Sequence, residues 1–201
     1  ATINEQNYIG SATGVLTITP ASATIILSNL SYTYDGTTKA ATVTTVPPGI
    51  LVSVTYSGIP KNAGSYIVTA VVNDANYTGN TSGILVVNKA LANVIAATSV
   101  IKKNDPLPSF TATFSGFVNG ENSSVVTSLT FTLSPAYTGN AGVYQIIPAA
   151  TANNYTFIPI NGTLYVNPYG PGTKNVKTSL ICVEQIPPDP NGFTYIAHFG
   201  Y

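Results

Sequence analysis

The sequence has few charged residues and a single cysteine. Only 7% of the 201 residues are charged, all seven basic residues are lysines, and the formal net charge is zero. Such a chain has no electrostatic attraction to nucleic acid or to an anionic membrane surface. Because Cys182 is the single cysteine, no disulfide can form within these residues. We therefore expect Cys182 to be a buried, small apolar side chain.

Long apolar runs are also missing from the sequence. No run approaches the roughly 20 residues that a membrane-spanning helix requires, and no secretory signal peptide is recognisable. We expect any leader to lie upstream of these residues. The 44% content of apolar residues, with so few charges, excludes the highly charged type of disordered chain.

The residues that are abundant favour β-structure. Tyrosine supplies thirteen of the aromatic residues and phenylalanine seven, while tryptophan is absent. Tyr, Thr, Val and Ile suit a pleated, half-buried surface. Residues 65–72 alternate so that Tyr66, Val68 and Ala70 share one face, and residues 51–56 alternate in the same way. Since no helical periodicity appears, we predict an all-β, Ig-like β-sandwich; a β-grasp arrangement is the alternative.

Internal repeats organise the chain. Residues 73–88 nearly copy residues 4–19 at an offset of 69, and a looser copy covers residues 154–167. The motifs Asn62-Ala-Gly-Ser-Tyr66 and Asn140-Ala-Gly-Val-Tyr144 lie 78 residues apart. One structural unit is therefore repeated in tandem. An array of similar modules suits length or multiple contacts better than it suits chemistry.

These repeats predict four segments. Residues 1–19 are the C-terminal strands of a preceding, truncated repeat, with a last strand at 14–18, and residues 20–89 and 90–168 are two complete Ig-like modules. Residues 169–201 are a linker, at 169–173, and the start of a further truncated β module. Its expected strands, at 180–184 and 193–199, flank a turn at 187–192.

The Ala-Gly-x-Tyr motif predicts a tyrosine corner. In Ig-like domains a tyrosine near the start of the penultimate strand bonds through its hydroxyl to upstream backbone. Tyr66 and Tyr144, preceded by Gly64 and Gly142, fit this position in the two modules. An ordinary core tyrosine after a turn is the alternative. In antibody domains the second cysteine stands at the positions that Val68 and Ile146 occupy here.

Other candidate residues are expected to build turns. Asp35-Gly36 is a turn signal, and the repeated Asn76-Tyr77 and Asn154-Tyr155 pairs are expected to serve turns between strands. Six asparagines lie in Asn-x-Ser/Thr sequons, which in a eukaryotic secreted protein would be glycosylation acceptors: Asn29, Asn76, Asn80, Asn122, Asn154 and Asn161. The recurrence of Asn-Tyr-Thr favours the turn role over modification.

Several motifs together resemble a known family. Tyr34-Asp-Gly36, residues 60–70 and residues 73–77 resemble the YDG/MBG-type Ig-like repeats of large secreted bacterial surface proteins. The second module is similar to the MBG type through residues 104–108, 114–120 and 153–157, but has Lys102-Lys103 where the family has a Tyr-Gly pair. The resemblance implies a place in an extracellular stalk or adhesin at the cell surface. It implies no catalytic residues.

The sequence provides little for catalysis or for cofactors. Nucleophilic catalysis needs a histidine base, and His198, the single histidine, lies in an expected strand. Paired carboxylates must converge, whereas the acidic residues are scattered: Glu5, Asp35, Asp74, Asp105, Glu121, Glu184 and Asp189. No calcium-binding loop, zinc ligand set or phosphate loop is present, so we expect a non-enzyme without cofactor or metal; weak Ca²⁺ binding is least unfavourable near Asp74 or Asp105.

The predicted function is therefore a structural spacer whose partners are neighbouring repeats of the same polypeptide. A module that binds carbohydrate or a partner protein is one alternative, because tyrosine and asparagine are abundant. A filament formed by strand addition between the truncated ends of neighbouring copies is another, since exposed strand edges invite pairing. Glycans or a cell-surface protein would be contacted by a tip outside these residues, and we expect no nucleic acid partner.

Overall fold

The chain folds almost entirely into β-structure. The computed structural model describes residues 1–170, 179–185 and 195–200. Strands make up 54% of the structure and helix 2%, which confirms the all-β, sandwich-type fold class. Two compact units form: the first comprises Ala1–Ala90 with the short segments Val118–Glu121 and Asn153–Thr156, and the second contains the other described residues.

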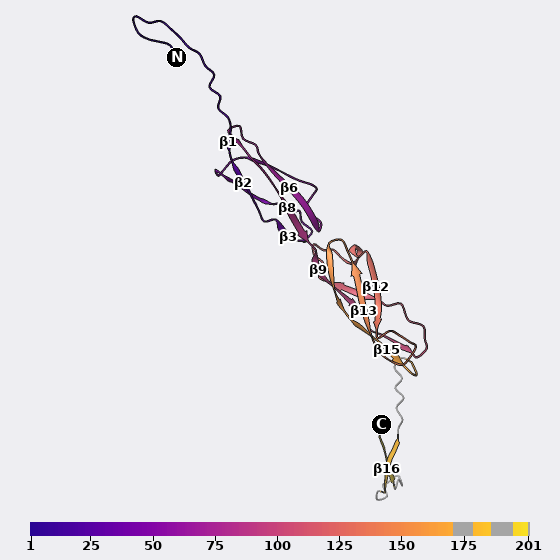
Figure 1. Ribbon diagram of the computed structural model, residues 1–201. Coiled ribbons are helices and arrows are strands. Elements are labelled where there is room, and N and C mark those ends of the chain that lie inside the picture. Colours follow the sequence, from indigo (N-terminus) through magenta and orange to yellow (C-terminus); the bar gives the residue numbers. More distant parts are fainter. Residues whose placement is uncertain (171–178, 186–194, 201) are drawn as a thin grey trace. The chain divides into compact units, whose positions relative to one another are not determined.

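The first unit contains a four-stranded sheet in the order β3-β8-β6-β5, with β3 parallel to β8 and the other neighbours antiparallel. β2 pairs with β4 and packs against β8 and β6, which gives the two layers of a sandwich (Figure 1). The strand bounds are β1 Ala21–Ser22, β2 Thr24–Ser28, β3 Ser31–Thr33, β4 Thr42–Val46, β5 Val52–Tyr56, β6 Gly64–Val72, β7 Tyr77–Thr78 and β8 Asn80–Asn88.

The second unit repeats this arrangement. Its four-stranded sheet has the order β10-β15-β13-β12, with β10 parallel to β15, and a second sheet has the order β11-β9-β14. The bounds are β9 Ala90–Ala96, β10 Ser99–Lys102, β11 Ala112–Ser115, β12 Ser128–Ser134, β13 Gly142–Thr151, β14 Tyr155–Ile160 and β15 Gly162–Asn167. Ala90 of β9 and the first two residues of β14 belong to the first unit. A single turn of 3-10 helix, η1, covers Ser123–Val125.

Matching positions form the cores of the two units. Strand alternation directs every second side chain inward, and the pairs Tyr66–Leu85 and Tyr144–Leu164 face each other in the same register. Val68 and Ile146 are each 0% exposed, as are Leu85 and Leu164, while Val87 and Val166 are each 2% exposed. Burying one such side chain stabilises the folded state by about 1.5–3 kcal/mol.

The N-terminal residues differ from the sequence prediction. Thr2 pairs with Ser11 and Glu5 with Tyr8, so the chain turns back on itself, but residues 14–18 form no strand. The predicted strand there is wrong for a physical reason: among the described residues no strand lies beside it, so its backbone groups have no ladder to join. Val15 and Leu16 are consequently exposed.

The C-terminal residues form a hairpin. β16, Ser179–Gln185, pairs antiparallel with β17, Tyr195–Gly200, close to the two strands expected there. The predicted turn at 187–192, which includes Asp189, and residues 171–173 of the predicted linker lie outside the described residues. Cys182 is exposed, contrary to the expectation of burial, because its two-stranded sheet has no third strand beside it among the described residues.

Candidate functional site

Three side chains from distant parts of the sequence meet within the first unit. The Tyr34 hydroxyl donates to Oε1 of Glu121 at 2.6 Å, and the Tyr155 hydroxyl donates to Oε2 of the same carboxylate. The two rings lie edge to face, with centroids 5.7 Å apart and planes inclined at 82°. Tyr34 is 3% exposed and Tyr155 2%. We call Tyr34, Glu121 and Tyr155 the tyrosine–glutamate clamp.

Local backbone structure positions each member of the clamp. Tyr34 follows β3, and its amide donates to the Asn88 carbonyl at 2.8 Å. Glu121 closes a tight turn in which its amide donates to the Val118 carbonyl at 3.0 Å, with Asn119 and Gly120 at φ 53° and 71°. Asn and Gly are the residues that best tolerate positive φ, as this turn requires.

A second set of bonds holds the residues next to Tyr155. The side-chain oxygen of Asn154 accepts from the Ala63 amide at 2.9 Å, and its side-chain nitrogen donates to the Asn62 side chain at 3.1 Å. The Asn154 carbonyl accepts from the Ala90 amide at 2.9 Å. These bonds fix the backbone from which Tyr155 reaches Glu121.

The clamp changes the acidity of its phenols. The hydrogen bond to Glu121, followed by burial, raises the pKa of Tyr34 to about 12. Burial, followed by the hydrogen bond to Glu121, raises the pKa of Tyr155. Both effects favour the neutral phenol, because an anion beside a carboxylate in a dry site is unfavourable. At neutral pH the tyrosines are therefore donors, and Glu121 is their common acceptor.

Within the clamp, the two phenol hydroxyls and the two carboxylate oxygens are therefore bonded to one another. His198 lies in β17, where its Nε2 is 3.3 Å from Oε2 of Glu184. Within the described parts of the chain, no group of three His, Cys, Asp or Glu side chains could hold a metal ion. No helix among them has the length and hydropathy of a membrane span.

Asp35 and Gly36, predicted to form a turn, lie directly beside the clamp. The Asp35 carboxylate accepts from the amide and hydroxyl of Thr37, at 2.8 and 2.6 Å, and pairs with Lys39. Lys39, followed by the Thr37 bonds, holds the pKa of Asp35 well below its usual range. Gly36 has φ 80°, and a Cβ built there would lie 2.5 Å from Nδ2 of Asn119. A side chain at this position would displace the turn that carries Glu121.

The two predicted corner tyrosines have the same hydrogen bond. The Tyr66 hydroxyl donates to the Asn62 carbonyl and the Tyr144 hydroxyl to the Asn140 carbonyl, both at 2.9 Å. Gly64 and Gly142 precede them with φ 157° and 159°, a conformation that L side chains rarely adopt. The repeated motif thus builds the same corner in both units.

The two Asn-Tyr pairs have different surroundings. Asn154 and Tyr155 belong to the contacts described above. Asn76 donates its amide to Asp74 and accepts from the Ala21 amide, both at 2.8 Å, while Tyr77 is half-buried at the start of β7. Glu121 was predicted only as one of several scattered acids, so sequence reasoning missed its contact with both tyrosines. The one signal was an acidic residue after an Asn-Gly turn.

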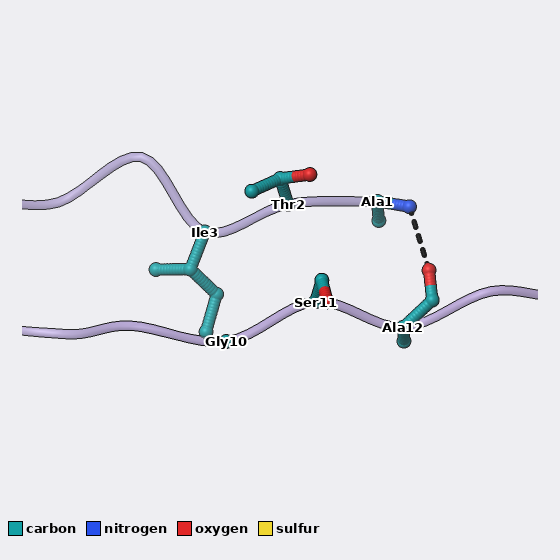
Figure 2. Close-up of a pocket in the computed structure, with 6 residues that line it drawn as sticks. All are labelled: Ala1, Thr2, Ile3, Gly10, Ser11 and Ala12. Carbon is teal, nitrogen blue, oxygen red and sulfur yellow. Dashed lines mark hydrogen bonds between the residues drawn. The ribbon is translucent and has the colours of Figure 1, made fainter.

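Two concave surfaces of the described residues are lined mainly by apolar and uncharged polar side chains. A cavity of about 290 Å³ lies between the two arms of the N-terminal turn. Its lining residues are Ala1, Thr2, Ile3, Gly10, Ser11 and Ala12 (Figure 2). The terminal amino group donates to the Ala12 carbonyl there at 2.9 Å (Figure 2). A groove of about 640 Å³ lies between residues 38–40, β5 and residues 58–60. Its charged group, Lys39, is already paired with Asp35.

Comparison with protein families gives two matches. A model described as MBG domain matches residues 1–22 and residues 23–91, and one described as MBG domain (YGX type) matches residues 92–165. The chain belongs to the MBG-domain family. The resemblance drawn from the motifs is thereby confirmed. MBG domains occur in large surface proteins and are not known as enzymatic domains. Comparison with curated proteins gives no match.

The MBG assignment clarifies two local features. Lys102-Lys103 departs from the expected Tyr-Gly pair, yet β10 still ends in a turn, because Asp105 donates its amide to the Lys102 carbonyl at 3.1 Å. Val118–Glu121 and Asn153–Thr156 fall within the second matched MBG domain in sequence but belong to the first compact unit. The first unit therefore contains residues of both matched domains.

Proposed function

We propose that these MBG domains are non-catalytic spacer repeats in the extracellular stalk of a bacterial surface protein. The observation that carries this proposal is the tyrosine–glutamate clamp, in which Tyr34 of one matched domain and Glu121 and Tyr155 of the next share hydrogen bonds. A spacer must keep consecutive domains associated. The clamp supports that role, because its polar groups form hydrogen bonds between residues of the two matched domains.

The surface chemistry is consistent with this role. With 7% charged residues and zero formal net charge, the chain attracts neither polyanions nor polycations. A spacer benefits from such a surface, because its purpose is to hold another part of the protein at a distance without binding competing partners.

The proposal is tested in the complete surface protein on living cells. Deleting residues 92–165 should reduce adhesion of the cells while leaving ligand binding by the purified protein unchanged. Replacing the same residues with an unrelated β-sandwich of similar length should restore adhesion. If the replacement fails although the protein reaches the surface, these residues have a specific binding role and the spacer proposal is wrong.

One observation favours binding as a second candidate function. On the outward face of the second unit, Tyr165 is 43% exposed between Val100 and Val143, which are 41% and 58% exposed and lie opposite it on β10 and β13. An aromatic ring among aliphatic and uncharged polar groups suits stacking on a sugar ring. Glycan-array binding that is lost on Tyr165→Ala would support this candidate.

A further inference from the structure

Two of the three Asn-Gly pairs of the chain lie in the described residues, and they have opposite structural settings; the third, Asn191-Gly192, lies outside those residues. Asn119 and Gly120 are both exposed, in the turn that carries Glu121, and a Cβ built on Gly120 would meet nothing within 4 Å. Gly162, after Asn161, is buried in β15, where it pairs with Ile146. A Cβ built on Gly162 would lie 2.5 Å from the Ala97 carbonyl oxygen. Gly120 therefore has open space around it, whereas Gly162 is enclosed.

We propose that Asn119 is a site of spontaneous deamidation and that its products open the tyrosine–glutamate clamp. Asparagine followed by glycine is the most susceptible sequence, because glycine lacks the Cβ that would block approach of the next backbone nitrogen. Asparagine is among the thermolabile residues for this reason. The inference depends on the turn and the clamp, and it is independent of the spacer role.

The reaction needs water and no other reactant. The Gly120 backbone nitrogen attacks Cγ of Asn119, an N–Cγ bond forms, and the Cγ–Nδ2 bond breaks. Nδ2 leaves as ammonia and takes up the proton that the Gly120 nitrogen loses, which leaves a succinimide ring. Water then adds to one of the two ring carbonyls. Opening at one carbonyl gives aspartate, and opening at the other gives isoaspartate, in which the main chain runs through the former side chain.

Both products act on Glu121 through the short turn. The new carboxylate lies two residues before Glu121, in the turn closed by the 3.0 Å bond between the Glu121 amide and the Val118 carbonyl. Isoaspartate also adds one methylene to the main chain of this turn. Since the Asn119 side chain lies against Gly36, which is two residues from Tyr34, the turn cannot lengthen without moving Glu121. The Tyr34 and Tyr155 hydroxyls then lose their common acceptor.

The 201-residue chain should be aged in mildly alkaline buffer and analysed by peptide mapping with mass spectrometry. Asn119 should deamidate at least about tenfold faster than Asn161, a ratio equal to about 1.4 kcal/mol of local opening free energy. In denaturant the two rates should become similar. Equal rates in the folded chain, or faster reaction at Asn161, would overturn the proposed site.

The effect on the clamp is measured separately, by alkaline absorbance titration of the tyrosines. Aged protein and Asn119→Asp should each contain one tyrosine fewer with a pKa near 12 than fresh protein. Asn119→Gly keeps a residue that tolerates positive φ but has no amide to react, so its titration should not change with ageing. Deamidation at Asn119 that leaves the titration unchanged would overturn the link to the clamp.

Discussion

The two Asn-Tyr copies have the same backbone contact but differ in their side-chain environment. The carbonyls of Asn76 and Asn154 accept from the amides of Ala21 and Ala90, at 2.8 and 2.9 Å. Tyr155 is nevertheless buried and bound to Glu121, whereas Tyr77 is half-buried and its hydroxyl makes no hydrogen bond within the described residues. The Asn-Tyr motif thus determines the backbone contact of the asparagine, whereas the surrounding residues determine what the tyrosine hydroxyl contacts.

The difference originates in a loop. In the first unit β4 ends at Val46 and β5 begins at Val52, with Pro47-Pro48-Gly49 between them and no acidic residue. In the second matched MBG domain, residues 116–127 separate β11 from β12 and include Glu121. The longer loop of one repeat thus provides a contact that the other repeat lacks, while the core and the corner are alike in both.

The largest expected effect comes from removing the shared acceptor. Glu121→Ala leaves two buried phenol hydroxyls without their charged partner, so the free energy of unfolding should fall by about 4 kcal/mol. Glu121→Gln keeps one acceptor oxygen and should lose about half as much. Urea denaturation followed by tyrosine fluorescence measures both, since the chain has no tryptophan.

A matched control for this substitution is Glu5→Ala, because Glu5 is exposed near the N-terminus. Its free energy of unfolding should stay within about 0.5 kcal/mol of the parent value. If Glu121→Ala lowers the free energy of unfolding no more than this control does, the clamp does not stabilise the fold. The two Asn-Tyr copies would then not differ in their contribution to stability.

The second-largest effect is expected from alkaline pH, which should weaken the clamp. The pKa of Tyr34 in the folded chain is about 12, above the value of about 10 in an unfolded chain, so the folded state holds this proton more tightly. The stabilisation is complete below pH 10 and is lost as pH rises toward 12, by up to about 3 kcal/mol. Denaturation measured across this range should show a smaller decline in Tyr34→Phe. An identical decline in parent and variant would contradict the assignment.

The smallest expected effect comes from removing the tyrosine hydroxyl in each of the two Asn-Tyr copies. Tyr155→Phe removes the hydroxyl that donates to Glu121 and accepts from the Val118 amide at 3.1 Å, and it should cost about 2 kcal/mol. Tyr77→Phe, the matched change in the other copy, should cost less than about 0.5 kcal/mol. Thermal or urea denaturation of the two variants decides the point, and equal losses would mean that the two tyrosines have equivalent roles.

Much of the fold could be predicted from the sequence because it depends on local pattern. Period-2 alternation in residues 65–72 places Val68 and Ala70 in the core, as observed. The strand predicted at 14–18 shows the limit of such reasoning, since alternation does not provide a neighbouring strand. Glu121 could not be predicted either: an acid after an Asn-Gly turn has the pattern of a surface loop, and only the fold brings Tyr34 and Tyr155 to it.

The parallel pairing within each four-stranded sheet has a mechanical consequence. β3 lies beside β8, and β10 beside β15, so an early strand of each unit runs alongside the last one in the same direction. Tension applied through the chain ends then pulls these neighbours in opposite senses along their length. The hydrogen bonds between these strands then bear the load together, in shear, instead of opening one after another. Two of them, each 2.8 Å long, join the Val86 amide to the Leu30 carbonyl and the Tyr34 amide to the Asn88 carbonyl.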